Sequence, residues 1–377
     1  MLLVADENIP GLEACFASKA QIRRLPGRHI GAEDVRDADL LLVRSVTQVN
    51  RALLKGSKVR WVGTCTIGRD HIDEVALSDM GVGVLSAPGC NAAAVVEYVV
   101  TALVVLERLY GLPVVGSTLG VVGCGQVGRR LVEAARFLGM NVIVCDPLLR
   151  QAPAPLVSLE ELLDQARIVS LHVPLVHGGL HSTYQMLGPK EMARLRPDAC
   201  LIQTSRGGVV DEQALLASFH EHPDRLLVMD VWQGEPWINP EVLARAAIAT
   251  PHVAGYSYEG KFRGTWMIYQ QLCRHLGWTP EVSLQECLAQ LTPINLDTLA
   301  DCGSLASALL AMVPLLRDDA ALRALRNEPD FGQGFDRLRK EYPLRFEFSN
   351  YSLPEMKHPV CGMLHALGCQ VDGFYRV

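Results

Sequence analysis

Three residues in the second half of the sequence carry the side chains that hydride transfer at an alcohol carbon needs. Such a reaction uses a base for the hydroxyl proton and a cation for a neighbouring carboxylate, and histidine and arginine suit these tasks. Arg206 precedes two glycines, Glu235 lies between a glycine and a proline, and His252 follows a proline. A carboxylate paired with the imidazole would fix its tautomer. Each residue alone has an ordinary structural explanation, but together and in this order they predict an acid/base site.

A glycine-rich run upstream of these residues is typical of a dinucleotide site. Gly123, Gly125 and Gly128 form a G-x-G-x-x-G pattern between the apolar run 119–122 and the helical run 126–138. In that context the first glycine permits a tight turn, the second lets the backbone approach a pyrophosphate, and the third permits close packing of helix and strand. The start of the helix offers unpaired N–H groups to the phosphates. A tight turn without a ligand is the alternative.

An acidic residue after the next apolar run favours the dinucleotide interpretation. Asp146 follows the run 141–145 and lies roughly 20 residues after Gly125, where a carboxylate can accept the ribose hydroxyls of NAD. The same carboxylate would repel the 2′-phosphate of NADP, and no arginine follows before Arg150. We therefore expect NAD rather than NADP.

The elements that must position these residues alternate regularly along the chain. Short apolar runs separated by helical stretches predict a first parallel sheet, with strands at 2–4, 40–43, 61–63 and 82–85. After a long helical stretch at 93–110, a second alternation predicts a doubly wound nucleotide-binding sheet. Its expected strands are 119–122, 142–145, 168–172, 201–203, 226–229 and 247–249. Beyond about residue 280, a helical stretch at 304–317 precedes β-like runs at 345–348 and 370–375, which indicates a small α+β domain.

The composition limits the partners and the compartment. The formal charge of −6 carries no basic excess for a nucleic acid, and the early acidic residues do not fit a signal peptide. The most apolar stretch, 92–106, is too short to cross a bilayer and contains Glu97, so we expect a buried helix. The eleven cysteines include no C-x-x-C pair; we interpret them as reduced core residues, although Cys65 and Cys124 lie in site-like loops. We expect a cytoplasmic protein that binds no nucleic acid, membrane or metal.

At Arg206, Glu235 and His252 the chain resembles the D-2-hydroxyacid dehydrogenase family, over about residues 1–280. The resemblance implies an α/β fold with two doubly wound parallel-sheet domains, a flavodoxin-like substrate domain and a Rossmann NAD domain. A small C-terminal α+β dimerisation domain would follow. The implied boundaries are 1–92 with 257–280 for the substrate domain, 93–256 for the NAD domain and 281–377 for the dimerisation domain.

The resemblance also implies a role for individual residues. Arg206 and Glu235 would be catalytic, and His252 would be the proton donor or acceptor. The implied substrate contacts are Ser45, Thr66 and Tyr256. The implied NAD contacts, besides the three glycines, are Gln126, Val127, Asp146, Asp230 and Gly255. Two departures from the family pattern, Cys65 and Gln185, affect fine contacts and remove no reacting group.

Two stretches, 44–47 (RSVT) and 252–265 (HVAGYSYEGKFRGT), resemble the family members that act on a phosphorylated four-carbon acid. They imply NAD-dependent oxidation of 4-phospho-D-erythronate to 2-oxo-3-hydroxy-4-phosphobutanoate in pyridoxal phosphate (vitamin B6) synthesis, by a homodimer. Arg44, Lys261 and Arg263 are candidates for holding the phosphate. One alternative is a family dehydrogenase for 3-phosphoglycerate, glyoxylate or hydroxypyruvate. The other is an NAD-sensing scaffold, against which the intact acid/base residues argue.

Overall fold

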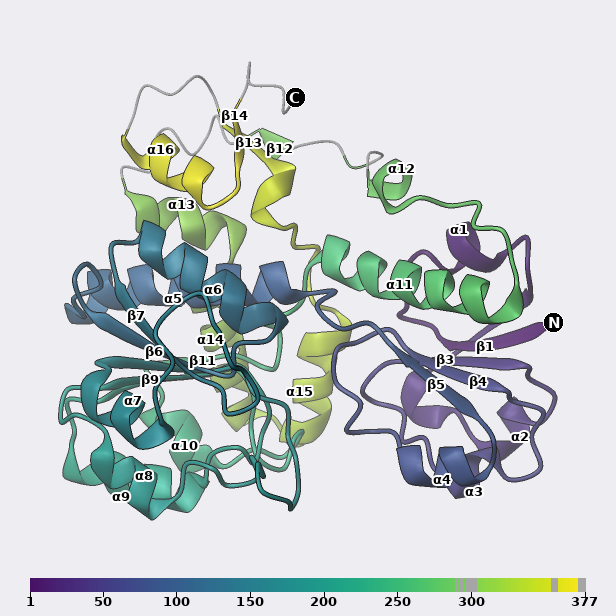
Figure 1. Cartoon of the computed structure of the whole chain (residues 1–377), viewed down its shortest axis with the longest axis horizontal. Helices are drawn as coiled ribbons and strands as arrows, with labels where there is room; N and C mark the ends of the chain where they lie inside the picture. Colours follow the sequence, from purple (N-terminus) through teal and green to yellow (C-terminus); the bar gives the residue numbers. More distant parts are fainter. Residues whose placement is uncertain (289–290, 292–293, 296–303, 354–358, 372–377) are drawn as a thin grey trace. The chain divides into compact units, whose positions relative to one another are not determined.

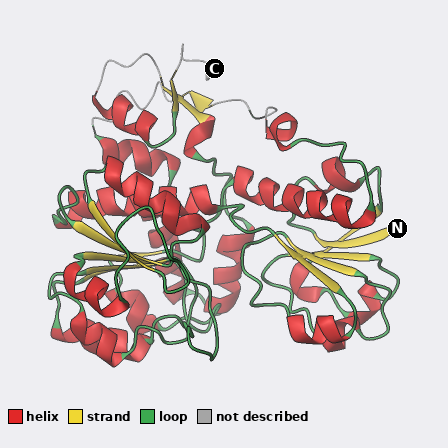
Figure 2. Cartoon of the chain, viewed as in Figure 1, coloured by secondary structure: helices red, strands yellow, loops and turns green. Residues whose placement is uncertain are grey.

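The computed structural model describes residues 1–288, 291, 294–295, 304–353 and 359–371 (Figures 1 and 2). Contacts divide the chain into two compact units. The first unit comprises residues 1–91 and 256–292, and the second comprises residues 92–255 and 293–377. This grouping joins the C-terminal segment to the part that holds the glycine-rich run. The division expected from the sequence, with a separate domain from residue 281, stays a prediction.

The first unit is built on a five-stranded parallel sheet in the order β2-β1-β3-β4-β5. Its strands are β1 (Leu2–Asp6), β2 (Gln21–Leu25), β3 (Leu40–Val43), β4 (Trp61–Thr64) and β5 (Gly83–Ser86). This order is that of a flavodoxin-like doubly wound sheet, as predicted. Strand β2 was not predicted, because an edge strand tolerates polar residues such as Gln21, Arg23 and Arg24, which weaken the apolar pattern.

Helices cover both faces of this sheet (Figure 1). One apolar cluster joins Leu3 and Leu42 of the sheet to α1 (Leu12–Phe16) and α11 (Tyr258–Leu276). The opposite cluster packs the sheet against α2 (Ala32–Val35), α3 (Arg51–Leu54) and α4 (Glu74–Asp79). A short turn, η1 (Gly27–His29), and helix α12 (Leu284–Leu288) complete the unit. Residues from the end of the second alternation thus return to the first sheet through α11.

The second unit contains a six-stranded parallel sheet in the order β11-β10-β9-β8-β6-β7. Its strands are β6 (Thr118–Val122), β7 (Asn141–Cys145), β8 (Ile168–Leu171), β9 (Cys200–Gln203), β10 (Leu226–Met229) and β11 (Ile248–Ala249). All six correspond to predicted strands. Beyond β7, a single parallel bridge pairs Val144 with Leu156, at the place where a Rossmann sheet has its third strand. The strand order therefore reverses between β6 and β8, where ligands of such sheets bind.

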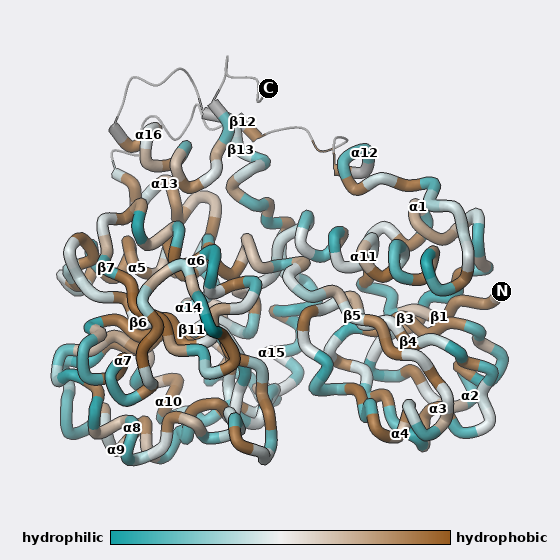
Figure 3. Tube along the Cα trace, in the orientation of Figure 1, coloured by the Kyte–Doolittle hydropathy of each residue, from teal (hydrophilic) through white to brown (hydrophobic). Residues whose placement is uncertain are grey.

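Two layers of helices enclose the second sheet, and the apolar residues follow its strands (Figure 3). One layer contains α5 (Ala92–Tyr110) and α6 (Gln126–Phe137). The other contains α7 (Leu159–Gln165), α8 (Pro189–Arg194), α9 (Glu212–Glu221) and α10 (Pro240–Arg245). Because α5 is buried from Val95 to Leu106, the prediction of a buried helix is confirmed. No helix within the described ranges has the length and apolarity needed to span a membrane.

The C-terminal segment differs from the sequence prediction in two places. The single helix expected at 304–317 is two helices, because Pro314 lacks the N–H that a continuous helix needs. The strand expected at 345–348 is wrong, since residues 345–347 have no regular secondary structure and Phe348 begins a 3-10 turn. The helices are α13 (Leu305–Met312), α14 (Leu315–Ala324), η3 (Leu325–Asn327), α15 (Phe331–Lys340), η4 (Phe348–Asn350) and α16 (Pro359–Ala366).

A small parallel sheet closes the C-terminal segment, in the order β12-β13-β14. Its strands are β12 (Ile294–Asn295), β13 (Tyr351–Leu353) and β14 (Gln370–Val371). The run expected at 370–375 begins with β14, and its remainder lies outside the described residues. Helix α14 packs beside β11, and the Asp319 carboxylate accepts a hydrogen bond from the Ala249 N–H at 2.8 Å. The segment therefore covers the edge strand of the second sheet.

Candidate functional site

The glycine-rich loop between β6 and α6 has the geometry that a dinucleotide requires. Gly123 has a φ of +87°, which favours glycine. A Cβ on Gly128 would lie 2.1 Å from the Gly123 carbonyl oxygen, so the helix and the loop touch through backbone. A Cβ on Gly125 would meet nothing within 4 Å. The tight turn and the close packing are thus internal to the protein, whereas the middle glycine faces open space that fits a pyrophosphate.

Asp146 lies at the end of β7 beside this loop. One carboxylate oxygen accepts the Cys124 N–H at 2.9 Å, and the other accepts the Leu148 N–H at 3.1 Å. An ionised carboxylate has about four acceptor positions, so acceptor capacity remains for ribose hydroxyls. Gln126 is exposed and Val127 is half-buried at the start of α6. These residues fit the adenosine and phosphate parts of NAD.

His252 and Glu235 form a direct pair. The imidazole Nδ1 lies 2.8 Å from Glu235 Oε2, and the two side chains are 28% and 19% exposed. The other carboxylate oxygen accepts the Trp232 N–H at 2.9 Å. Burial acts to raise the pKa of Glu235, but the charge and hydrogen bond of His252, helped by the charge of Arg339, hold that pKa below its ordinary value. The pair thus combines an ionised carboxylate with an oriented imidazole.

Arg206 lies on the loop after β9, which packs against the loop of Glu235 through backbone. A Cβ on Gly207 would lie 1.9 Å from the Trp232 carbonyl oxygen, so only glycine permits this approach. The side-chain amide of Gln203 donates to the Arg206 carbonyl at 2.8 Å. The Arg206 guanidinium donates to the Ser205 carbonyl at 2.7 Å and is half-buried. Gly207 therefore permits the loop of the cation to pack against the loop of the carboxylate.

The turn that carries His252 is fixed by a buried carboxylate. His252 has a φ of 58°, a left-handed conformation that is uncommon for residues other than glycine. Asp230, at the end of β10, is 1% exposed and accepts the N–H groups of Val253 and Ala254 at 2.7 and 3.0 Å. Its third donor is the Thr250 hydroxyl at 2.6 Å. Burial raises the pKa of Asp230, while the His252 charge and these hydrogen bonds oppose that rise.

Two residues that the sequence analysis missed complete the support of this turn. The Tyr98 hydroxyl of α5 lies 2.8 Å from the Thr250 hydroxyl, and the Trp232 indole donates to the Thr250 carbonyl at 2.9 Å. Both aromatic side chains are almost fully buried. Tyr98 lies 152 residues from Thr250 in the sequence. In the sequence, Tyr98 is distinguished only as a hydroxyl group within an apolar helix, and this pattern does not indicate which residue it contacts.

The substrate contacts expected from the sequence lie in the first unit. The Arg44 guanidinium donates to the Tyr256 hydroxyl at 3.0 Å, and the Lys261 ammonium lies 4.2 Å from the centre of the Tyr256 ring. The Thr66 hydroxyl bonds the Thr64 hydroxyl at 2.8 Å. Ser45 is exposed, and Gly255, at the end of the second unit, is half-buried. The structure thus brings Arg44, Tyr256 and Lys261 together and gives Thr66 a separate set of partners.

The cysteines of the two site-like loops are core residues. Cys65 and Cys124 are 7% and 1% exposed, and burial raises the pKa of both thiols. A thiol that stays protonated is a poor nucleophile. Within the ranges that the structure describes, no group of three histidine, cysteine or acidic residues is placed to hold a metal ion.

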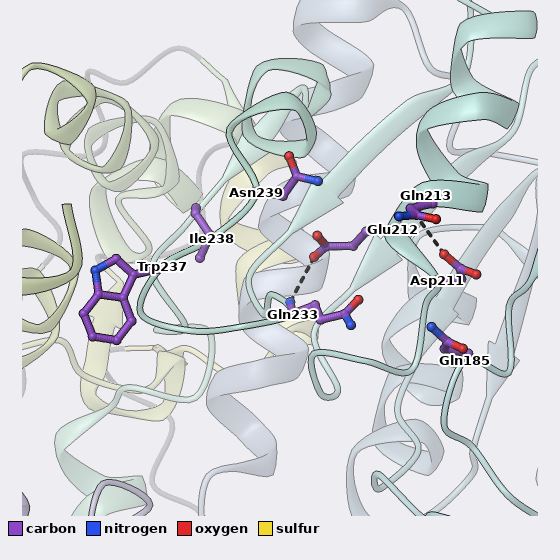
Figure 4. Close-up of a pocket in the computed structure, with 8 residues that line it drawn as sticks. All are labelled: Gln185, Asp211, Glu212, Gln213, Gln233, Trp237, Ile238 and Asn239. Atoms are coloured by element: carbon purple, nitrogen blue, oxygen red, sulfur yellow. Dashed lines mark hydrogen bonds between the residues drawn. The ribbon is translucent and has the colours of Figure 1, made fainter.

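A separate polar pocket of the second unit involves the loop that carries Glu235 (Figure 4). It is lined by residues that include Gln185, Glu212, Gln233 and Trp237. The Glu212 carboxylate accepts the Gln233 N–H at 2.9 Å, and burial, together with the charges of Asp211 and Glu235, raises the pKa of Glu212. Gln185, one of the two departures from the family pattern, therefore contributes to this pocket.

Two stretches of the chain match known families. Residues 96–254 match the family described as D-isomer specific 2-hydroxyacid dehydrogenase, NAD binding domain. Residues 288–368 match a domain of unknown function (DUF3410). The first match contains the glycine-rich loop, Asp146 and all three acid/base residues. Its description and the geometry of the loop both indicate NAD as the cofactor.

Two relatives that match nearly the whole chain have the same name. The erythronate-4-phosphate dehydrogenase of Ectopseudomonas mendocina (strain ymp) is 50% identical over 353 residues, which cover 92% of this chain and 93% of that protein. The erythronate-4-phosphate dehydrogenase of Pseudomonas putida (strain W619) is 46% identical over 379 residues, which cover 98% of this chain and 100% of that protein. The similarity therefore includes the C-terminal segment.

Solved structures share the fold over about three quarters of the chain. An NAD⁺-bound 3-phosphoglycerate dehydrogenase from Entamoeba histolytica has a TM-score of 0.65 at 24% identity and covers 75% of this chain and 98% of its own. The TT0316 protein from Thermus thermophilus has a TM-score of 0.64 at 24% identity, covering 74% and 99%. At this identity the likeness concerns the fold alone.

The glycine-rich loop gives a first prediction, in which two alanine substitutions have different effects. Gly125→Ala should weaken NAD binding at least about tenfold, because its Cβ enters the space of the pyrophosphate, while the Tm stays nearly unchanged. Gly128→Ala should cost roughly 1–3 kcal/mol of stability, because its Cβ meets the Gly123 carbonyl. Calorimetric titration with NAD and thermal unfolding separate the two. A lower Tm with normal NAD affinity in Gly125→Ala would contradict the assignment.

The pKa shifts of two glutamates give a second prediction, with opposite pH trends. The lowered pKa of Glu235 stabilises the fold above the ordinary glutamate range, and this contribution is lost as the pH falls through the lowered pKa. The raised pKa of Glu212 acts in the reverse sense, so that stability is lost as the pH rises from about 4. The Tm of the unsubstituted protein should therefore rise with pH relative to Glu235→Gln and fall relative to Glu212→Gln. Thermal unfolding between about pH 3 and 7 measures both trends, and equal trends would refute the assignment.

Proposed function

We propose that this chain, which belongs to the erythronate-4-phosphate dehydrogenase family of the D-isomer specific 2-hydroxyacid dehydrogenases, oxidises 4-phospho-D-erythronate at C2. The product is 2-oxo-3-hydroxy-4-phosphobutanoate, an intermediate of pyridoxal phosphate synthesis. The names of the relatives support the substrate. The observation that carries the reaction type is the 2.8 Å pair of His252 and Glu235 on loops that follow strands of an NAD-binding sheet. NAD supplies the acceptor for the hydride that leaves C2.

His252 takes the proton of the C2 hydroxyl in this proposal. The lowered pKa of Glu235 keeps its carboxylate ionised, so the carboxylate accepts and the imidazole Nδ1–H donates. The other ring nitrogen, Nε2, is then unprotonated and able to act as the base. When Nε2 takes the proton, the positive charge of the imidazolium lies at hydrogen-bond distance from the negative charge of Glu235. Glu235 thus orients the base and stabilises its protonated form.

Arg206 holds the C1 carboxylate and the C2 oxygen in the same proposal. A guanidinium presents paired donors in one plane, which matches a carboxylate and an adjacent oxygen. Its loop is fixed by Gln203 and by the contact of Gly207 with Trp232. Ser45, Thr66 and Tyr256 would contact the remainder of the acid. The NAD contacts that we propose are the glycine-rich loop with Gln126 and Val127, together with Asp146, Asp230 and Gly255.

The substrate phosphate would bind the cationic cluster of Arg44, Tyr256 and Lys261. Arg44 and Lys261 each lie against the Tyr256 side chain, so two positive charges converge on one phenol. Arginine and lysine are the usual partners of phosphate oxygens. Arg263, the third candidate, donates to the Cys90 carbonyl and supports the fold of the first unit. We therefore favour Arg44 and Lys261 for the phosphate.

We also propose that the C-terminal segment joins two copies of the chain in a homodimer. Large apolar side chains are exposed in its described part, where Leu344 is 67% and Met363 is 42% exposed. Single exposed apolar side chains are ordinary on a protein surface, so the proposal depends on the family resemblance and these residues are only compatible with it.

A substrate panel is the third prediction and tests the proposed function directly. NADH formation should be fastest with 4-phospho-D-erythronate when a 2-oxo acid acceptor is added, so that tightly held NADH does not hide turnover. 3-Phosphoglycerate and glycerate are tested in parallel as alternative substrates. His252→Ala should lower kcat by about 10²–10⁴-fold, because the base is lost. Preference for another acid would exclude 4-phospho-D-erythronate as the substrate. A loss of kcat under about tenfold in His252→Ala would refute the role of His252 as the base.

The cationic cluster gives the fourth prediction. Arg44→Gln should raise the KM for 4-phospho-D-erythronate by about 10–100-fold, the effect of one charged hydrogen bond. The kcat/KM for unphosphorylated erythronate should change little. Arg23→Gln is the matched control, because Arg23 is a paired surface arginine of the same unit, 3.1 Å from Asp34. Equal losses of Arg44→Gln on both acids would exclude a phosphate contact.

A further inference from the structure

A residue of the C-terminal segment binds the turn that carries His252. Arg345 is 4% exposed, and its guanidinium donates to the Ala254 carbonyl at 3.1 Å. A second nitrogen of the same group donates to the Ala94 carbonyl of α5 at 2.8 Å. Arg345 lies within the stretch 288–368 that matches a domain of unknown function. The contact therefore links that domain to a backbone group two residues after His252.

The peptide groups on both sides of Ala254 are hydrogen-bonded to buried charged side chains. Asp230 accepts the Ala254 N–H at 3.0 Å, and Arg345 donates to the Ala254 carbonyl. Hydrogen bonds with one ionised partner are roughly twice as strong as neutral ones. The left-handed conformation of His252 costs of order 1–3 kcal/mol and persists only where the surroundings enforce it. Asp230 supplies the restraint from the sheet, and Arg345 supplies it from the C-terminal segment.

Glu97 explains how Arg345 is held in a buried place. This carboxylate lies in the apolar helix α5, is 6% exposed and approaches Arg345 at 3.3 Å. Its other oxygen accepts the Phe348 N–H at 2.7 Å. A buried charge is costly unless it is paired and hydrogen-bonded. These two partners of Glu97 belong to the C-terminal segment, so this acidic residue within an apolar helix helps to dock that segment.

We propose that Arg345 is a positioning residue of the reaction, through which the C-terminal segment fixes the His252 turn. The segment then has a role within each chain besides any role between chains. Without the guanidinium, the Ala254 carbonyl loses its donor, the turn gains freedom and the imidazole leaves its productive position for part of the time. The inference rests on the proposed function of His252, because a turn with no reacting group would have nothing to position.

The fifth prediction compares Arg345 with a second arginine of the same segment. Arg323 of α14 donates to the Leu243 and Ala246 carbonyls at 2.8 Å each, so it anchors the segment to the end of α10. Arg345→Met should lower kcat at least about tenfold, since misplacement of a reacting group by about 1 Å can cost as much as a hundredfold. The KM for 4-phospho-D-erythronate should stay within about twofold, and Arg345→Lys should recover part of the kcat. Arg323→Met should lower the Tm but keep the kcat.

Two further measurements separate positioning from simple loss of stability. The double variant Glu97→Gln/Arg345→Met removes the buried cation and the buried anion together, so it should fold even if the loss of the cation beside Glu97 destabilises Arg345→Met. It should still show the low kcat. Hydrogen exchange of the amides of residues 252–255 should be faster in Arg345→Met and in the double variant, and unchanged in Arg323→Met.

Two results would overturn the inference. The first is wild-type kcat and wild-type exchange of residues 252–255 in the double variant. The second is an equal loss of kcat in Arg323→Met, which would make the effect a general one of docking the segment. The exchange experiment needs no turnover. Failure of the unsubstituted protein to oxidise the acid would therefore count against the proposed function, while the exchange rates would still decide on Arg345.

Discussion

The site depends on one buried carboxylate, that of Asp230 at the end of β10. A carboxylate without water needs donors, and here the donors are the backbone N–H groups of Val253 and Ala254 and the hydroxyl of Thr250. Satisfying Asp230 therefore requires the chain after β11 to turn sharply, with His252 at positive φ. The rigid sheet fixes Asp230, Asp230 fixes the turn, and the turn presents the imidazole. A flexible loop could not hold the ring with the same accuracy.

The second constraint is steric and acts between the loops after β9 and β10. Gly207 lies so close to the Trp232 carbonyl that any Cβ would collide with it. The Trp232 N–H bonds Glu235, and the Trp232 indole bonds the carbonyl of Thr250. One residue thus joins the loop of Arg206, the loop of Glu235 and the strand end before His252. Arginine, carboxylate and histidine come from three strands, yet their positions depend on a shared set of backbone contacts.

The sequence could predict the features that local chemistry determines. The dinucleotide loop could be predicted from the three glycines, Asp146 and the strand–loop–helix context, because the steric reason for each glycine lies within a few residues of it. The apolar strands gave both parallel sheets, whereas β2 was missed because its edge position permits polar residues. The pairs of Tyr98 with Thr250 and of Arg345 with Ala254 join residues 152 and 91 positions apart, and nothing in the local pattern identifies such partners. The false strand at 345–348 has the same origin, since the Arg345 side chain donates to carbonyl groups of the distant residues Ala94 and Ala254.

Buried charge has a different purpose here from buried apolar surface. The desolvation cost of an ion pair such as Arg345 and Glu97 roughly offsets its attraction, so apolar residues of similar size would stabilise the fold about as well. Apolar residues could not donate to the Ala94 and Ala254 carbonyls. The guanidinium has fixed donor directions, and Glu97 fixes the guanidinium in turn. Because Asp230 restrains the N–H side of Ala254 and Arg345 its carbonyl side, the two charges act on one short turn, and the position of the imidazole follows from both.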